Sequence, residues 1–431
     1  MNIAVIGTGY VGLVAGTCLA ETGNRVLCID KDSEKVRWLR QGHLSIYEPG
    51  LEPLFRRATA QGRLTFGVSL KEAVDHAEIL FLALPTPENE DGSADLSHVL
   101  DVVHDLAQLI QERKLVVMKS TVPVGTAARA REIFLRSHCP AVVASNPEFM
   151  REGFAVEDFM KPDRIVIGAT DPWARQILAA LYQPFLREDH PILFMSEESA
   201  ELTKYAANTF LAMKISFMNE LARLAEGCGA NIDDIRLALG ADDRIGGRFL
   251  FAGLGYGGSC LPKDVKALVH QARVFQVPLR LAEAVQEVNT TQLDFFLTKI
   301  LRHFEGQLSG RHFAVWGLAF KPDTDDVREA PALKIIRFLF RHGASVRAFD
   351  PEASANALKQ IPDLEISSDM YQALEGADAL ILCTEWSLFR SPDFDVMAQK
   401  LKYKVIFDGR NVYQPDEVRR RGFTYYSIGR P

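Results

Sequence analysis

The sequence predicts an α/β protein with two Rossmann-like, doubly wound parallel-sheet domains joined by a central region of long helices. Two stretches, 2–30 and 311–350, each run strand, glycine, helix and a second strand that ends in aspartate. Between them lie two long helical patterns without internal proline, at 196–226 and 279–303. We therefore expect three domains, whose bounds are 1–195, 196–305 and 306–431.

Length and composition agree with a multi-domain globular chain. The chain has 431 residues, and 47% of them are hydrophobic, which suggests two to four domains at roughly 150 residues each. The 49 basic and 56 acidic residues give a net charge of −7, so no basic surplus favours nucleic acid as a partner. The apolar N-terminus lacks a basic leader and carries four glycines by position 16, which argues against a signal peptide or a membrane span.

The cysteines and histidines indicate neither a disulfide framework nor a metal site. The six cysteines are far apart and form no Cys-x-x-Cys pair, whereas disulfide scaffolds are dense in closely spaced cysteines. The ten histidines form no cluster with typical metal-ligand spacing. A reducing, cytoplasmic location fits this pattern best.

The first strand–helix–strand unit carries a dinucleotide fingerprint. The strand pattern at 2–6 is followed by Gly-Thr-Gly-Tyr-Val-Gly at 7–12, then by a helix and by a strand at 25–30. A Gly-x-Gly-x-x-Gly motif alone is weak evidence, but this context makes it specific. Backbone N–H groups at the helix start would bind a pyrophosphate, and Asp30 would bind the ribose hydroxyls. An acidic residue at that position favours NAD over NADP, a preference that Lys31 and Lys35 would weaken.

Polar residues follow three later strand patterns of the same domain. These patterns lie at 77–84, 115–119 and 141–144. Thr86, Thr121 and Glu148 come shortly after their carboxyl ends, where ligands gather in open α/β sheets. By position alone, each residue is a site candidate or else a plain cap or turn residue.

The first long helical pattern carries both a polar pair and an apolar face. Lys204 and Asn208 are four residues apart and share one side of the helix. They are either solvated surface residues or a pair directed at a ligand. The apolar face is formed by residues that recur every three or four positions, and it could form a dimer seam: Leu202, Ala206, Phe210, Met213, Phe217, Leu221 and Leu224.

The stretch 255–264, Gly-Tyr-Gly-Gly-Ser-Cys-Leu-Pro-Lys-Asp, predicts a reactive thiol on a glycine-rich loop. Pro262 suits the first turn of a helix, so Cys260 would lie at a helix N-terminus. The helix dipole and Lys263 would favour its thiolate there, and Asp264 adds a carboxylate one turn on. The alternative is a buried and inert cysteine, which the glycines and charged neighbours disfavour.

The third domain repeats the nucleotide-binding order without the fingerprint. The strand at 311–317 ends in glycine, but Leu-Ala-Phe-Lys-Pro-Asp follows it at 318–323. A phosphate bound here would therefore need side-chain cations, and Lys321 and Arg328 are available. This difference predicts a second nucleotide ligand, distinct from the one in the first domain.

Taken together, the motifs closely resemble the UDP-glucose/GDP-mannose dehydrogenases over essentially the whole chain. The matching stretches are 7–12, 119–121, 146–153, Lys204 with Asn208, 255–264, 317–328 and 408–410. Asp-Arg-Ile-Gly at 243–246 resembles the UDP-glucose branch more than the GDP-mannose branch. In that branch the residue matching Arg244 reaches the substrate of the partner subunit, which implies a homodimer.

The resemblance implies oxidation of a sugar C6 alcohol to a carboxylate with two NAD⁺ in succession. Asp264 and a water held by Thr121 would accept the alcohol proton, and Lys204 and Asn208 would stabilise the oxyanion. Cys260 would form a thiohemiacetal and then a thioester, with Glu148 as the base for hydrolysis. The implied cofactor residues are Gly7, Gly9, Tyr10, Val11, Gly12, Asp30, Lys35, Thr86, Thr121, Glu152, Lys263 and Arg328. The implied substrate residues are Glu148, Phe149, Glu152, Lys204, Asn208, Arg244, Tyr256, Gly257, Lys321 and Arg410.

Three alternatives stay open at this point. The substrate is UDP-glucose, or else another nucleotide sugar such as a UDP-N-acetylhexosamine or GDP-mannose. A two-electron β-hydroxyacid dehydrogenase also has a Rossmann domain followed by helices, but it has no use for Cys260. A non-catalytic nucleotide-sugar sensor would keep 7–12 without needing Lys204, Asn208, Cys260 and Asp264 together.

Overall fold

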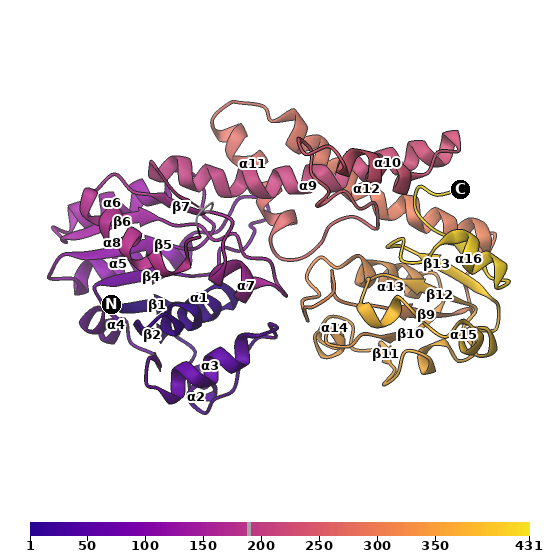
Figure 1. Cartoon of the computed structure of the whole chain (residues 1–431), viewed down its shortest axis with the longest axis horizontal. Helices are drawn as coiled ribbons and strands as arrows, with labels where there is room; N and C mark the ends of the chain where they lie inside the picture. The colour runs from indigo at the N-terminus through magenta and orange to yellow at the C-terminus, as the bar shows by residue number, and fades with distance from the viewer. Residues whose placement is uncertain (188–190) are drawn as a thin grey trace. The chain divides into compact units, whose positions relative to one another are not determined.

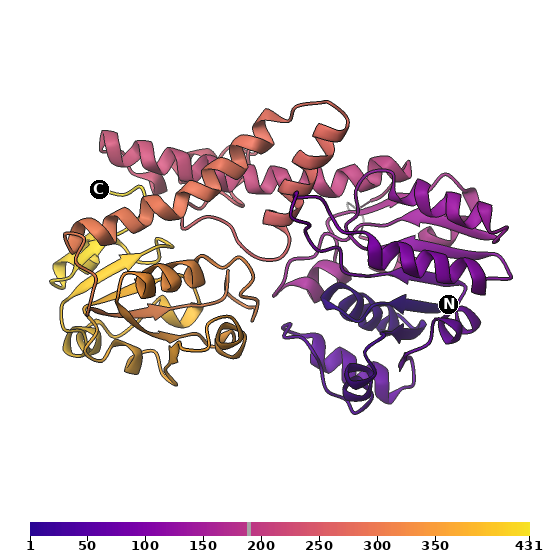
Figure 2. The same cartoon turned by 180° about the vertical axis from the view of Figure 1, so that it is seen from behind.

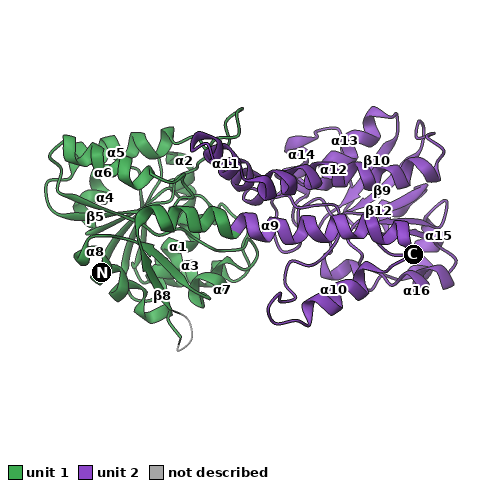
Figure 3. Cartoon of the chain, turned by 90° about the horizontal axis from the view of Figure 1, so that it is seen from above, with its two compact units in different colours: residues 1–207 green, residues 208–431 purple. Residues whose placement is uncertain are grey.

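The computed structural model describes residues 1–187 and 191–431. These residues form two compact units, 1–207 and 208–431, which Figure 3 shows in two colours. Helix α9 (Glu197–Cys228) runs through the boundary between them. The division into three domains at 195 and 305 stays a prediction. Within the described residues, no helix combines the length and the apolar character that crossing a membrane would require.

The first unit is built on an eight-stranded sheet in the order β3-β2-β1-β4-β5-β6-β7-β8 (Figure 1). All neighbouring strands are parallel except β6 and β7, which are antiparallel through the single pair Ser145 and Gly168. The sheet is thus not wholly parallel, although its doubly wound order is the expected one. The strands are β1 (Asn2–Ile6), β2 (Arg25–Ile29), β3 (Leu64–Gly67), β4 (Ile79–Leu82), β5 (Lys114–Met118), β6 (Ala141–Ser145), β7 (Ile165–Gly168) and β8 (Ile192–Met195).

Helices cover both faces of this sheet, because its strands are apolar on both sides. One core joins the sheet to α1, α2, α3, α7 and α8, and a second core joins the other face to α4, α5 and α6 (Figure 2). These helices are α1 (Tyr10–Glu21), α2 (Ser33–Arg40), α3 (Leu51–Ala60), α4 (Leu70–His76), α5 (Ser97–Leu109), α6 (Thr126–Arg136), α7 (Ala155–Met160) and α8 (Pro172–Tyr182), with a 3₁₀ turn at Gln183–Phe185.

The central helices are α9, α10 (Ile232–Gly240), α11 (Leu261–Val274) and α12 (Arg280–His303). Three of these four, α9, α11 and α12, lie almost where the sequence predicts them, whereas α10 was not predicted. Part of the predicted apolar face of α9 is exposed to solvent instead of packing in a core. Phe210, Phe217 and Leu224, spaced by seven residues, expose 58%, 51% and 64% of their surface. In this single chain α9 therefore carries an exposed apolar stripe along one side.

The second unit contains a six-stranded sheet in the order β11-β10-β9-β12-β13-β14, and all of its pairs are parallel. Its strands are β9 (His312–Trp316), β10 (Ser345–Phe349), β11 (Glu365–Ile366), β12 (Ala379–Leu382), β13 (Val405–Asp408) and β14 (Thr424–Tyr426). Its helices are α13 (Pro331–Arg341), α14 (Ser354–Gln360), α15 (Phe394–Lys400) and α16 (Pro415–Arg420), with 3₁₀ turns at Gln372–Leu374 and Ser387–Phe389.

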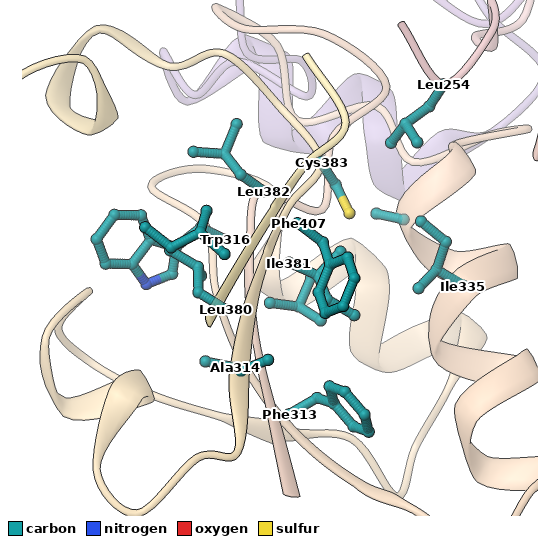
Figure 4. Close-up of a cluster of buried hydrophobic side chains, with 14 of the residues drawn as sticks. Leu254, Phe313, Ala314, Trp316, Ile335, Leu380, Ile381, Leu382, Cys383 and Phe407 are labelled. Atoms are coloured by element: carbon teal, nitrogen blue, oxygen red, sulfur yellow. The ribbon is translucent and has the colours of Figure 1, made fainter. Parts of the chain in front are cut away.

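Aromatic side chains pack on both sides of this second sheet. Figure 4 shows Trp316 on one side of the strands and Phe313 and Phe407 on the other. Trp316 is fully buried, stacks on Phe389 at 5.1 Å and donates its indole N–H to the Met370 carbonyl at 2.8 Å. The helix α12 packs its Phe296 and Ile300 into the same core. With Ile232 of α10 in the same core, this packing fixes α10 and α12 to the C-terminal sheet within one unit.

Candidate active site

The turn between β1 and α1 has the geometry of a pyrophosphate site. Gly7 has φ of +101°, which an L side chain rarely adopts. A Cβ on Gly12 would lie 1.9 Å from the Gly7 carbonyl oxygen, whereas one on Gly9 would meet nothing within 4 Å. No side chain caps the start of α1, so its first N–H groups can bind an anion. The turn therefore fits the dinucleotide that the fingerprint predicts.

Asp30 lies just past the end of β2 and is fixed from several sides. Its Oδ2 accepts from the Thr8 hydroxyl at 2.5 Å and from the Lys35 ammonium at 3.1 Å. Burial alone would raise the pKa of Asp30, but hydrogen bonds from Thr8 and Asp32 together with Lys35 outweigh it and lower that pKa. The carboxylate is thus ionised and can accept hydroxyl groups. Lys35 forms an ion pair with Asp30 itself. The charge of Lys35, which suggested a weaker preference for NAD, is therefore partly neutralised by Asp30.

The ends of β4 and β5 bring two of the predicted polar residues, Thr86 and Thr121, together in the first unit. Thr86 donates its hydroxyl to the Thr121 carbonyl at 2.9 Å. The Ser120 hydroxyl donates to the Leu84 carbonyl at 2.7 Å. These bonds join the two loops that follow β4 and β5. Thr86 and Thr121 are therefore neighbours at the carboxyl edge of the sheet, as their positions after the strands predict.

Glu148 and Lys204 form a buried ion pair in the first unit. The Lys204 ammonium lies 3.0 Å from Glu148 Oε1, and their side chains are 4% and 6% exposed. Glu148 Oε2 accepts from the Met150 backbone N–H at 2.5 Å. The Phe149 ring lies 5.2 Å from the Lys204 ammonium and 3.9 Å from the Arg164 guanidinium. The loop after β6 therefore supplies the carboxylate of this ion pair, and the N-terminal part of α9 supplies the cation.

Glu48 holds the dinucleotide turn to the loop that carries Glu148, a contact that the sequence analysis missed. Glu48 is 5% exposed and accepts from the Tyr10 hydroxyl. It also accepts from the N–H groups of Gly153 and Ala155, both at 2.7 Å. The Tyr10 hydroxyl is thus used in a contact within the protein. Glu152 lies close enough to Tyr10 to interact with it electrostatically. The only sequence signal was a Tyr-Glu-Pro-Gly turn at 47–50, which looks like an ordinary loop.

In the second unit, Asp264 is the centre of a buried polar cluster. Asp264 is 1% exposed and accepts from the Asn208 amide and from the Lys263 ammonium, both at 2.6 Å. Asn208 is 7% exposed. Asn208 and Lys204, four residues apart on the continuous helix α9, are thus both buried rather than solvated. This outcome supports the functional interpretation of the pair that the sequence left open.

Cys260 is exposed and forms the N-cap of α11. Its helix begins at Leu261 with Pro262 in the first turn, as predicted. Of the six cysteines only Cys228 is also exposed, and the other four are buried. An exposed thiol at a helix N-terminus is an arrangement that favours a reactive thiolate. The alternative of a buried cysteine at this position is therefore wrong, whereas the reactivity of the thiol stays a prediction.

The glycines before Cys260 are required by close backbone packing. A Cβ on Gly257 would lie 2.4 Å from the Glu329 carbonyl oxygen, and one on Gly258 would lie 2.7 Å from the Phe320 ring. Asn289 of α12 accepts from the Tyr256 N–H at 2.8 Å and donates to its carbonyl at 3.1 Å. The loop is thus fixed between α12 and the loops after β9. Asn289 was not foreseen, because a single asparagine in a long helix carries no signal.

The basic residues predicted to bind ligands in the second unit differ in their hydrogen-bond and ion-pair partners. Arg410 donates to the carbonyls of Cys383 and Phe320 at 2.7 and 2.9 Å. Lys321 lies 5.6 Å from the Phe320 ring. Arg328 pairs with Asp326, and Arg244 pairs with Asp242 at 2.6 Å on a loop where its side chain is 89% exposed. Within this unit the structure therefore groups Arg410, Lys321 and the Cys260 loop around Phe320, while Arg244 lies on the surface.

Three family models match the chain in order. The UDP-glucose/GDP-mannose dehydrogenase family NAD binding domain matches residues 1–186. The central domain of the same family matches residues 198–291. Its UDP binding domain matches residues 314–415. The fingerprint turn, the Cys260 loop and the fingerprint-free sheet thus fall in different domains of one family.

Relatives match over the full length. A UDP-glucose 6-dehydrogenase of Pseudomonas aeruginosa is 48% identical, and the match covers 100% of this chain and 98% of the relative. The structure of a UDP-glucose dehydrogenase from Pyrobaculum islandicum has a TM-score of 0.92 at 39% identity, covering 100% and 98%. That of a UDP-D-ManNAc dehydrogenase from Pyrococcus horikoshii has a TM-score of 0.87 at 26% identity, covering 100% and 99%. With its NAD fingerprint, exposed Cys260 and three domain matches, the chain belongs to the UDP-glucose/GDP-mannose dehydrogenase family.

Proposed function

We propose that the protein oxidises the C6 alcohol of UDP-glucose to a carboxylate in two NAD-dependent steps through a covalent intermediate on Cys260. The observation that carries this proposal is the exposed Cys260 at the start of α11, four residues from the buried Asp264 cluster. The 48% identical relative named a UDP-glucose 6-dehydrogenase supports the substrate. NAD would accept a hydride in each oxidation, and the β1–α1 turn with Asp30 would hold it.

The first oxidation converts the alcohol to an aldehyde. The proton of the C6 hydroxyl passes to Asp264, either directly or through a water that Thr121 holds. Lys204 and Asn208 stabilise the negative charge that develops on the C6 oxygen. Buried positions strengthen both effects, because little water competes for these groups.

Cys260 then retains the reactive aldehyde. Its thiolate adds to the aldehyde carbon, and the oxygen takes a proton to give a thiohemiacetal. A second NAD would accept the hydride from this carbon, and the hydroxyl proton would pass to water, which leaves a thioester. Water, deprotonated by Glu148, attacks the thioester carbon, and the Cys260 thiolate leaves. The products are the uronate and the free enzyme, so the atoms and electrons balance with two hydrides removed per sugar.

The first prediction concerns stoichiometry and sugar choice. We expect two NADH per sugar consumed with UDP-glucose, because oxidation of an alcohol to a carboxylate removes four electrons. NADH absorbance against product measured by chromatography, across a panel of nucleotide sugars, checks this. UDP-N-acetylmannosamine belongs in the panel, because the 26% identical structural relative is named for that sugar class.

The outcomes of this panel separate the alternatives. Preferred turnover of a UDP-N-acetylhexosamine would change the substrate and leave the mechanism intact. One NADH per sugar would reduce the protein to a simple alcohol dehydrogenase. Binding of NAD and nucleotide sugar without turnover would indicate the sensor.

We further propose a homodimer in which Arg244 acts on the substrate of the partner. The exposed stripe of Phe210, Phe217 and Leu224 supports association, because apolar side chains in such a row favour a protein interface. Arg244 supports this arrangement, because its side chain is 89% exposed and, within residues 1–187 and 191–431, its hydrogen bonds and ion pair are with the neighbouring Asp242. A cation on such a loop can reach an anionic ligand bound elsewhere.

The second prediction tests this arrangement by complementation. We expect R244A and C260S homodimers each to have little activity. After subunit exchange, a mixed dimer would contain one site with both Cys260 and a partner's intact Arg244. At equal amounts the activity should rise to about a quarter of the wild-type value, since about half of the dimers are mixed and have one working site. Activity that stays at the sum of the two homodimers would place Arg244 in its own subunit's site or outside any site.

A further inference from the structure

Glu201 is a buried carboxyl group on the second turn of α9. Its residue is 3% exposed. Its Oε2 accepts from the Gly125 backbone N–H at 2.7 Å, and its Oε1 accepts from the Ala127 backbone N–H at 2.8 Å. The Ser145 hydroxyl donates to Oε1 in a longer contact of 3.5 Å. Two backbone N–H groups and one hydroxyl, all of them neutral, thus hold this side chain.

The two N–H groups lie at the start of α6, which has no local cap. Gly125 is the N-cap of α6, has φ of +96° and supplies no side-chain hydrogen bond. A serine or an aspartate at such a position usually caps the helix from within its own segment. Here the acceptor is 74 and 76 positions away in sequence. The cap therefore joins α6 to α9 instead of only completing α6.

The contacts of Glu201 also close a ring around the buried ion pair. Ser145 is the last residue of β6 and precedes Glu148 by three positions. Lys204 follows Glu201 by three positions on α9, so the two share one side of the helix, and its ammonium lies 3.0 Å from Glu148. The ring runs from Glu201 through the end of β6 to Glu148, and it returns through Lys204 along α9. All of these residues belong to the first unit.

A second carboxylate, Glu197, holds the same end of α9 one turn earlier. It is 1% exposed and accepts from the Arg131 guanidinium at 2.5 Å and from the Thr170 hydroxyl at 3.1 Å. A Cβ on Gly168 of β7 would lie 2.6 Å from the Glu197 Cα, so the helix lies directly against the sheet. The partners of Glu197 lie in the middle of α6 and after β7. Glu197 thus fixes α9 without contacting the segments that hold Thr121 and Glu148.

Helix capping alone is a weak reason for a carboxyl group at position 201. Burial raises the pKa of Glu201 to about 7, although the N–H groups of Ala127 and Gly125 oppose this shift. Taking such a group out of water costs free energy. What the carboxyl group offers in return is one acceptor oxygen for each of the two N–H groups, whereas a glutamine offers a single oxygen. Two bonds to neighbouring N–H groups fix both the position and the rotation of α9 at this turn.

We propose that Glu201 is a positioning residue that fixes α9 on the first unit, so that Lys204 is held in place for stabilising the C6 oxyanion. This role rests on the proposed function of Lys204. Glu201 touches neither substrate nor cofactor in this proposal and acts only through the helix. Stabilisation of an oxyanion depends on donor placement to well within about 1 Å. A small shift of α9 therefore lowers the rate without unfolding the protein.

The test is the rate of the first hydride transfer in Glu201→Gln. The amide keeps one acceptor oxygen and turns its N–H₂ group toward the other backbone N–H, which displaces α9. Full-length enzyme in excess is mixed with UDP-glucose and saturating NAD at about pH 8.5, above the pKa of Glu201. The first phase of NADH absorbance should be about tenfold slower than in the wild type. Steady-state KM values for UDP-glucose and NAD should change by less than about threefold, because Glu201 contacts neither ligand.

Glu197→Gln is the matched control on the same helix. It removes the ion pair with Arg131, so it should lower the melting temperature and leave the first phase unchanged. A rate that falls equally in Glu197→Gln and Glu201→Gln would show general loosening of α9 and overturn the proposal. A lower melting temperature of Glu201→Gln with a wild-type rate would also overturn it. If Glu201→Gln does not fold, Glu201→Asp replaces it; its shorter side chain keeps the charge but cannot reach both N–H groups, so the same fall is expected.

Lys204→Met separates the two levels of inference. It should slow the first phase by about 10²-fold or more, as loss of an oxyanion donor does. Adding Glu201→Gln to Lys204→Met should then change the rate by less than about twofold, because the residue to be positioned is gone. A further tenfold fall in the double variant would show that Glu201 acts elsewhere.

The single variants complete the comparison. If Lys204→Met has the wild-type rate, Lys204 does not stabilise the oxyanion, and both that step of the proposed function and the role of Glu201 are wrong. If Lys204→Met is slow while Glu201→Gln is as fast as the wild type, only the role of Glu201 is wrong. A slow first phase in both, with no further fall in the double variant, supports both.

Discussion

Replacing Cys260 by serine should lower uronate formation by at least about 10³-fold. A serine hydroxyl is a weaker nucleophile than a thiolate, and an oxygen ester hydrolyses more slowly than a thioester. The variant should therefore stall with a sugar ester on the introduced serine. Rapid quenching and mass spectrometry of the protein would detect the added mass, and chromatography would quantify the uronate.

The matched control for this prediction is Cys228→Ser. Cys228 is the other exposed cysteine and is the last residue of α9. Its replacement should leave turnover close to that of the wild type. Release of free uronate by Cys260→Ser at the wild-type rate would show that Cys260 is not the nucleophile.

The Asp264→Asn variant should have the second largest effect, a fall in kcat of about 10²- to 10⁴-fold. The carboxylate is the proposed proton acceptor, and it also accepts from Asn208 and Lys263 at 2.6 Å. An amide cannot accept the proton, and it weakens both of these contacts. With UDP-glucose deuterated at C6, the variant should show a larger isotope effect, because the first oxidation becomes rate-limiting.

Glu283→Gln is the control for charge loss in the same unit. Glu283 is 41% exposed and pairs with Arg273 at 3.2 Å, so its neutralisation should change stability by less than about 0.5 kcal/mol and leave kcat unchanged. A thermal melt of Asp264→Asn separates a folding defect from a chemical one. A folded Asp264→Asn with wild-type kcat would exclude Asp264 as the base.

The site residues that sequence reasoning found share a local signal. The Gly7–Gly12 motif lies between a strand and a helix, and Cys260 lies between glycines and a proline. Both signals concern backbone conformation over a few residues, where sequence is informative. Lys204 and Asn208 needed the helical period, which places residues four apart on one side. The family resemblance then assigned chemistry to residues that pattern alone left ambiguous.

Glu48 and Asn289 show why other residues around the candidate site were missed. Glu48 meets Gly153 and Ala155 across more than 100 positions of sequence, with separations of 105 and 107. Asn289 meets Tyr256 at a separation of 33. Each is an ordinary polar residue in its own segment. Only the fold determines that its partner lies in a loop of the candidate site.

The sequence alone determined the fold class, the NAD fingerprint, the long helix and the thiol at a helix start. It could do so because hydrophobic period, glycine placement and helix caps are local properties of the chain. Tertiary structure decided which polar groups are buried and paired. It placed Glu148 against Lys204 and Asp264 against Asn208, because burial depends on how distant segments pack. It also left Phe210, Phe217 and Leu224 exposed on α9. The apolar period predicts which side of the helix is apolar, but it does not predict which segments pack against that side.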